Sequence, residues 1–93
     1  MAAYVVVHAT KLNDEKYQEY ASVAGPSIVA CGGEVLTRGL SETLAGESAH
    51  KMMVIAKFPT KEEAKKWYNS SEYQAIIPTR NEAMDAIFVL GGE

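Results

Sequence analysis

The fold is decided by the first apolar run of the chain, AYVVVHAT at residues 3–10. β-branched valines favour an extended backbone, and polar residues follow directly, so the run is predicted to be a strand. Successive side chains of a strand point to opposite faces of its sheet. Tyr4, Val6 and His8 therefore share one face, and Val5, Val7 and Ala9 share the other. A sheet with water on one side alternates apolar and polar residues, whereas both faces are apolar here, so we expect both to be covered.

Two later runs have the same two-sided apolar character and are predicted to be strands, and a shorter run precedes them. The three predicted strands are residues 34–38, 51–58 and 86–90. Turn residues in 39–46 leave room for a short strand around residues 43–44. Residues 91–92 are two glycines and are expected to form a frayed tail.

A helix is predicted between the first two strands. Apolar residues from Tyr17 to Cys31 recur at offsets of 3, 4, 7, 11 and 14 positions, which places them on one helical face. Asn13 or Asp14 can cap its start, and Gly32 or Gly33 can take the left-handed conformation at its end. The pair at residues 25–26, Gly-Pro, is expected to kink or split this helix.

More helix is predicted between the third strand and the last. Thr60 and Glu63 have the S/T-x-x-E spacing of a capping box, which opens a helix through Asn69. In the next stretch, Pro78 is expected to bend or restart the helix. The predicted shared face of that stretch consists of Tyr73, Ile76, Ile77, Arg80 and Met84.

The order strand, helix, strand, strand, helix, strand predicts an α+β fold with both helices on one face of a four-stranded antiparallel sheet. The opposite apolar face then needs another cover, and a twofold partner copy is its simplest source. A chain of 93 residues is long enough for one core and too short for two, so a single domain over 1–93 is expected.

Composition argues against several partners. The net charge is −3 and no Lys/Arg cluster is dense enough to neutralise a row of phosphates, so nucleic acid is not expected. No apolar run approaches the ~20 residues of a membrane span. The start lacks the pattern of a secretory signal, which predicts a cytoplasmic protein. Without a Gly-rich phosphate loop or metal-ligand spacing among His8, His50 and Cys31, no cofactor or metal is expected.

A set of residues spread over nearly the whole chain is similar to a known family. Its most specific part is WYNSSEYQ at residues 67–74 with Arg80 behind it. The set also includes Gly32-Gly33, Arg38-Gly39, Phe58-Pro59 and Ala64. In these residues the chain resembles the domain of unknown function 1330. The resemblance implies a ferredoxin-like β-α-β-β-α-β fold in the dimeric α+β barrel superfamily, where two sheets face each other, and it implies no reaction.

Arg38 and Arg80, which the family pattern includes, are the first candidate ligand-binding residues. A guanidinium offers a rigid fork of donors, so the two could together hold a carboxylate. The alternative is that either arginine pairs with an acidic neighbour or with carbonyls at a helix end.

His8, on the strand face away from the helices, could be a general base or bind a ligand. The alternative is that it lies at the rim of a dimer interface, bonded to backbone or water. Tyr73 and Trp67 could line the same cavity as the arginines, although aromatic residues at helical spacing are more often core. His50 is expected to be a solvated loop residue, and Cys31 a buried inert thiol.

Two functions follow from these candidates. The first is a homodimeric protein that binds a small acidic molecule in a pocket of each protomer, or a cofactor-independent enzyme using that pocket. The second is a noncatalytic dimeric module, in which the same residues serve packing and solubility.

Overall fold

The structure, a computed structural model, describes residues 2–92. Its elements in chain order are β1 (Ala3–Lys11), α1 (Asp14–Ala30), β2 (Glu34–Leu40), β3 (Met52–Phe58), α2 (Lys61–Tyr68), α3 (Ser71–Ala83) and β4 (Met84–Gly92). The strands form one antiparallel sheet in the order β2-β3-β1-β4. This is the predicted ferredoxin-like fold, with the second helical segment made of two helices.

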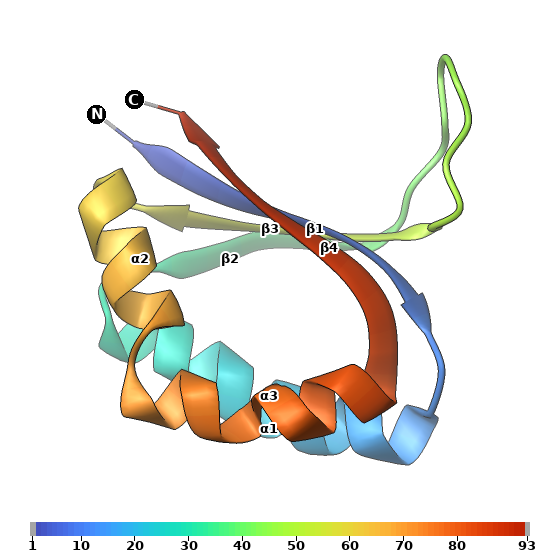
Figure 1. Cartoon of the computed structure of the whole chain (residues 1–93). Helices are drawn as coiled ribbons and strands as arrows, with labels where there is room; N and C mark the ends of the chain where they lie inside the picture. The colour runs from blue at the N-terminus through green and yellow to red at the C-terminus, as the bar shows by residue number, and fades with distance from the viewer. Residues whose placement is uncertain (1, 93) are drawn as a thin grey trace.

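All three helices lie on one side of the sheet, with α1 and α3 side by side (Figure 1). The side chains of β1 that face them are buried, with Val5 exposed by 6% and Ala9 by 1%. On the opposite face, Ile87 and Val89 of β4 are exposed by 55% and 54%. The predicted assignment of the two faces is therefore confirmed. Within residues 2–92, no helix has both the length and the apolar character that a membrane crossing requires.

Strand pairing lines up the apolar residues of the exposed face in rows. Val6 of β1 lies between Ile55 of β3 and Val89 of β4. The next row has the same order, with His8 between Met53 and Ile87.

Side-chain caps begin the helices where the sequence predicts them. The Asn13 side chain accepts a hydrogen bond from the backbone N–H of Lys16 at 2.9 Å and starts α1. The Thr60 hydroxyl accepts one from the N–H of Glu63 at 3.1 Å and starts α2. Each cap satisfies a backbone donor that has no partner inside the helix. Gly32 ends the α1 segment with φ of 83°, the predicted left-handed conformation.

The Gly25-Pro26 pair was expected to kink or split the first helix. The split is wrong, because α1 runs through Pro26 from residue 14 to residue 30, and the kink stays a prediction. Buried residues on either side of the proline, Ala24 and Ile28, hold both halves of the helix against the core. Tertiary packing supplies most of a helix's stability, so it offsets the single lost backbone donor. Helix α3 likewise passes through Pro78, but it ends before Met84, which starts β4.

Two expectations for the strands are also corrected. Residues 43–44 form no strand and lie in the loop between β2 and β3. Residues 91–92, expected to fray, belong to β4 and pair with Tyr4 and Ala3. Strand β1 is long enough to offer backbone hydrogen-bond partners to residues 91–92, so β4 continues past the apolar run that the local sequence shows.

Candidate functional site

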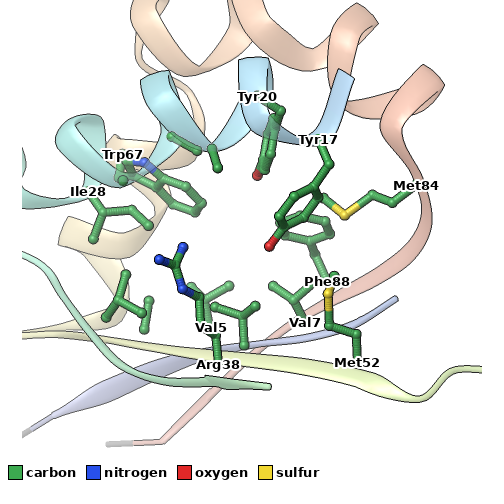
Figure 2. Close-up of a pocket in the computed structure, with 16 residues that line it drawn as sticks. Val5, Val7, Tyr17, Tyr20, Ile28, Arg38, Met52, Trp67, Met84 and Phe88 are labelled. Atoms are coloured by element: carbon green, nitrogen blue, oxygen red, sulfur yellow. The ribbon is translucent and has the colours of Figure 1, made fainter. Parts of the chain in front are cut away.

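A cavity of about 70 Å³ lies between the sheet and α1. Its walls are mostly apolar, and Figure 2 shows Val5, Val7, Met52 and Phe88 on the sheet side with Tyr17 and Tyr20 on the helix side. A water needs roughly 10–15 Å³ of such space, so the cavity has room for about five water-sized groups. It therefore suits a compact molecule.

The cavity exists because α1 presents small side chains to the sheet edge. Ala21, Ala24 and Gly25 line it from the helix. A methyl group placed on Gly25 would meet nothing within 4 Å apart from its own chain neighbours and the helix backbone. Larger residues at these positions would fill the space between the helix and β2.

Arg38 is the only charged residue among those that line the cavity in the described chain. Its guanidinium points from β2 into the space between Ile28 and Tyr17 (Figure 2). Two open surface hollows also meet at Arg38, one against Tyr17 and one against Gly25. Arg38 therefore lies at the mouth of the cavity, between the edge strand β2 and α1.

A register irregularity in β2 turns Arg38 toward this cavity. Val35 pairs with Ala56, but after one extra residue Thr37 pairs with Ile55 and Arg38 with Val54. Val54 faces the helices, so Arg38 does too. In a regular ladder Arg38 would pair with Met53 and face the other side, because one residue of slip reverses every side chain.

The Arg38 side chain is also free of intramolecular partners within residues 2–92. The ion pairs there join other residues, and the arginine side-chain hydrogen bonds belong to Arg80. An exposed, unpaired guanidinium at the mouth of an apolar cavity can receive a carboxylate without breaking an existing bond.

Tyr20 brings a hydroxyl group to the inner part of the cavity (Figure 2). Its oxygen lies 2.9 Å from the hydroxyl oxygen of Tyr73, which is fully buried. Burial raises the pKa of Tyr20 far above its ordinary value of 10.0, and the adjacent Tyr73 adds to the rise. Burial also raises the pKa of Tyr73. Both phenols therefore keep their protons at neutral pH.

Arg80 lies behind this pair of tyrosines. One of its guanidinium nitrogens donates to the hydroxyls of Tyr68 and Tyr73, each at 3.1 Å. The guanidinium carbon lies 4.8 Å from the centre of the Phe88 ring, a cation–π contact. A chain of hydrogen bonds through Tyr73 and Tyr20 thus links Arg80 to the cavity.

The family is shown by a match to the model described as Domain of unknown function (DUF1330), which covers residues 2–91. The chain belongs to this family. No curated protein matches the DUF1330 chain significantly.

Solved structures of the same fold lie at low sequence identity to this DUF1330 chain. A protein of unknown function from Rhodopseudomonas palustris has a TM-score of 0.80 at 17% identity, covering 99% of this chain and 82% of that one. A dimeric ferredoxin-like protein of unknown function from Jannaschia has 0.77 at 10%, covering all of both chains. SnoaB, a cofactor-independent oxygenase from Streptomyces nogalater, has 0.72 at 8%, covering 99% and 92%. These likenesses show the fold.

The structure separates the four ligand-binding candidates of the sequence. Only Arg38 lines the cavity. Arg80 and Tyr73 contact each other behind the cavity wall, so the two arginines do not line one pocket. His8 lies on the opposite face of the sheet, with Met53 and Ile87 as its neighbours across the strands.

Three further predictions concern residues near these candidates. Trp67 and Tyr73 are core residues, exposed by 2% and 0%, and Trp67 also contributes to the cavity wall. The prediction that His50 is solvated is wrong. It is 9% exposed and its Nδ1 lies 2.8 Å from the Thr10 hydroxyl oxygen, because the loop folds back onto the end of β1. Cys31 is half-buried at the end of α1, so it is less enclosed than expected.

Sequence reasoning placed Tyr17 and Tyr20 on the buried face of a helix but missed their hydroxyls as site groups. The available signal was chemical, because a buried tyrosine needs a hydrogen-bond partner for its hydroxyl. On a helix face made otherwise of small and aliphatic residues, such a group indicates a polar partner or a ligand.

No cluster of three His, Cys, Asp or Glu side chains that could hold a metal ion is found among residues 2–92.

Proposed function

We propose that this protein binds a small carboxylic acid in the cavity between the sheet and α1, with Arg38 as the partner of the carboxylate. The observation that supports it best is the unpaired guanidinium of Arg38 at the mouth of an otherwise apolar cavity. Such a cavity, with a few polar groups that orient the ligand, is typical of small-molecule sites.

Binding is proposed ahead of catalysis because of the residues that line the cavity. General acid–base chemistry uses His most often, and also Asp, Glu, Lys, Cys or Tyr. Of these types the described lining residues include only Tyr17 and Tyr20, and burial raises the pKa of Tyr20, so that its phenol keeps its proton and is no base near neutral pH. The other polar side chains of the lining are Arg38 and the Trp67 indole. The indole N–H already donates to the Ser27 hydroxyl at 2.9 Å.

The protein is further proposed to act as a homodimer in the cytoplasm. The dimer is supported by the apolar sheet face around Val6, Ile87 and Val89. It is also supported by the description of the Jannaschia protein as dimeric. The cytoplasmic location rests on the sequence alone.

A thermal-shift screen of short aliphatic and aromatic carboxylates, each beside its uncharged amide, tests the binding proposal. A ligand that binds only the folded state stabilises it by about 2.7 kcal/mol at one hundred times its Kd, which raises the Tm of a domain of this size by roughly 10–20 °C. We expect at least one acid to raise Tm and its amide to have no effect. Replacement Arg38→Met should remove the shift while leaving the unliganded Tm within about 2 °C.

Lys57→Met is the matched control, because Lys57 is an exposed cation on the neighbouring strand and lies on the opposite face. It should keep the full shift. If no acid stabilises the protein, or if Arg38→Met keeps the stabilisation, the proposed site is wrong. The first of these results would favour the noncatalytic dimeric module.

A further inference from the structure

Tyr20 has a hydrogen-bonding capacity that the protein does not use. A phenol can donate one hydrogen bond and accept others, and the Tyr20 hydroxyl contacts a single partner, Tyr73, within residues 2–92. Figure 2 shows its oxygen directed into the cavity. Whichever way the pair is oriented, one more bond can be made on the cavity side.

When a ligand acceptor is present, Arg80 determines which of the two hydroxyls, Tyr20 or Tyr73, donates the hydrogen bond between them. A guanidinium only donates, so the Tyr73 oxygen accepts from Arg80. Accepting from a cation strengthens Tyr73 as a donor, since hydrogen bonds in a chain polarise one another. Tyr73 then donates to Tyr20, and Tyr20 donates into the cavity. The three groups form a relay that ends in a donor.

The relay ends in a neutral donor and not in a base. Burial holds the pKa of Tyr20 above its ordinary range, so a phenolate does not form near neutral pH. A neutral phenol in an apolar cavity favours an oxygen acceptor, such as a carbonyl or hydroxyl oxygen of a ligand. The Tyr20 phenol would give such an acceptor a hydrogen bond in a place from which the ligand has displaced most of the water.

Beside the Tyr17 hydroxyl and the Trp67 indole, the cavity therefore has two polar groups of different character among its mostly apolar walls. Arg38 at the mouth matches a carboxylate, and Tyr20 within matches a second, uncharged oxygen. With room for about five water-sized groups, only a short chain can link the two.

From this juxtaposition we infer that the ligand is a short oxo acid, whose carboxylate pairs with Arg38 and whose keto oxygen accepts a hydrogen bond from Tyr20. Tyr73 and Arg80 are positioning residues that orient the Tyr20 hydroxyl. The inference rests on the proposed function, because it requires a carboxylate at Arg38.

Calorimetric titration with matched pairs of acids tests the inference. The keto acids pyruvate, acetoacetate and levulinate are compared with propionate, butyrate and valerate, which lack the keto oxygen. The three spacings are needed because the second oxygen must reach Tyr20. At least one keto acid should bind about tenfold more tightly than its parent, as expected for one well-made hydrogen bond.

Variants assign the preference to the relay. Tyr20→Phe should reduce the keto preference to less than about twofold while the parent acid binds as before. Tyr73→Phe, which removes the donor to Tyr20 but leaves the Tyr20 hydroxyl, should reduce it partly. This second variant keeps the test decisive if Tyr20→Phe folds poorly. Tyr4→Phe, on the outer face of β1, is the control and should keep the full preference.

The outcomes separate the two proposals. If parent acids bind but no keto acid is preferred, the oxo-acid inference is wrong and the carboxylate site stands. If the preference survives in both Tyr20→Phe and Tyr73→Phe, or is lost in Tyr17→Phe instead, the assignment to Tyr20 is wrong. If no acid of either kind binds, both proposals fall.

Discussion

At the scale of single residues, two arginines of this chain have opposite environments. Arg38 is exposed, unpaired within the described residues and directed into a cavity. Arg80 donates to two tyrosine hydroxyls and lies over the Phe88 ring. The sequence offered an acidic neighbour or helix-end carbonyls as alternatives to ligand binding, and the partners found are two phenols and, at 3.5 Å, the side-chain oxygen of Asn81. The family pattern therefore contains one arginine open to a ligand and one built into the protein's own aromatic cluster.

The buried tyrosines are expected to make the free energy of unfolding fall at alkaline pH. The pKa of Tyr20 is raised by burial, so the folded protein resists deprotonation while the unfolded chain loses this proton near the ordinary value of 10.0. The contribution is fully present below pH 10 and is lost as pH rises above it. We expect the free energy of unfolding to fall by up to about 1.4 kcal/mol per pH unit for this group.

Urea unfolding at several pH values between about 9 and 11 measures this slope. Tyr20→Phe should flatten it relative to the unmutated protein. Tyr4→Phe is the comparison, because Tyr4 lies on the outer face of the sheet. Equal slopes for Tyr20→Phe and the unmutated protein would show that Tyr20 is not protected in the folded state.

At the scale of the elements, α1 and the turn that follows it use glycine in two different ways. Gly25 lies inside the helix beside the cavity, with nothing within 4 Å of an added Cβ apart from its own chain neighbours and the helix backbone. Gly33 follows the helix, and a Cβ there would lie 2.5 Å from the Phe58 ring and 2.8 Å from Ile28. Phe58 is fully buried, so its ring has no free space into which to move. The first glycine leaves space open, and the second allows the chain to pass close to the core.

These environments predict different effects of the same substitution. Gly25→Ala should change the free energy of unfolding by less than about 0.5 kcal/mol, because the gain from restricting the unfolded chain is offset by contact of the new Cβ with Pro26, which disfavours a helical backbone at residue 25. Gly33→Ala should destabilise it by about 1–3 kcal/mol through overpacking against Phe58. Chemical unfolding of both variants beside the unmutated protein checks the pair. A Gly25→Ala variant as destabilised as Gly33→Ala, or a Gly33→Ala variant of unchanged stability, would contradict the described packing.

At the scale of the whole molecule, one face of the sheet carries exposed apolar side chains and is covered by no helix. Its centre is the row of Val6, Ile55 and Val89, beside the row of His8, Met53 and Ile87. The loop between β2 and β3 projects on the same side, away from the helices, and carries Leu44 exposed by 94% (Figure 1). A second copy placed on this face would cover both, which is the arrangement proposed above.

Val6→Asp tests that arrangement. A carboxylate at Val6 would be buried without a partner in the dimer, at a cost of several kcal/mol, but would be solvated in a lone protomer. We expect monomer or aggregate at concentrations where the unmutated chain is dimeric by light scattering. Val29→Asp, on an exposed site of α1, is the control and should remain dimeric. A monomeric unmutated protein at ~100 μM, or a fully dimeric Val6→Asp, would overturn the dimer.

Local patterns in the sequence determined the order of the elements, the two faces of β1 and the cap at Thr60, and they limited the cap of the first helix to Asn13 or Asp14. They also predicted Trp67 and Tyr73 as core. These features depend on residues within a few positions of one another, because side-chain period and cap chemistry are local properties of the chain.

Only the tertiary structure decided which of these residues meet. The irregularity in β2 turns Arg38 inward, and no local pattern shows it, because the register is set by pairing with β3. The contact of Tyr20 with Tyr73 joins residues that lie 53 positions apart. The burial of His50 likewise depends on Thr10, 40 positions away. Such contacts follow from how the sheet and helices pack together, so the sequence supplied the candidate residues and the packing selected the site.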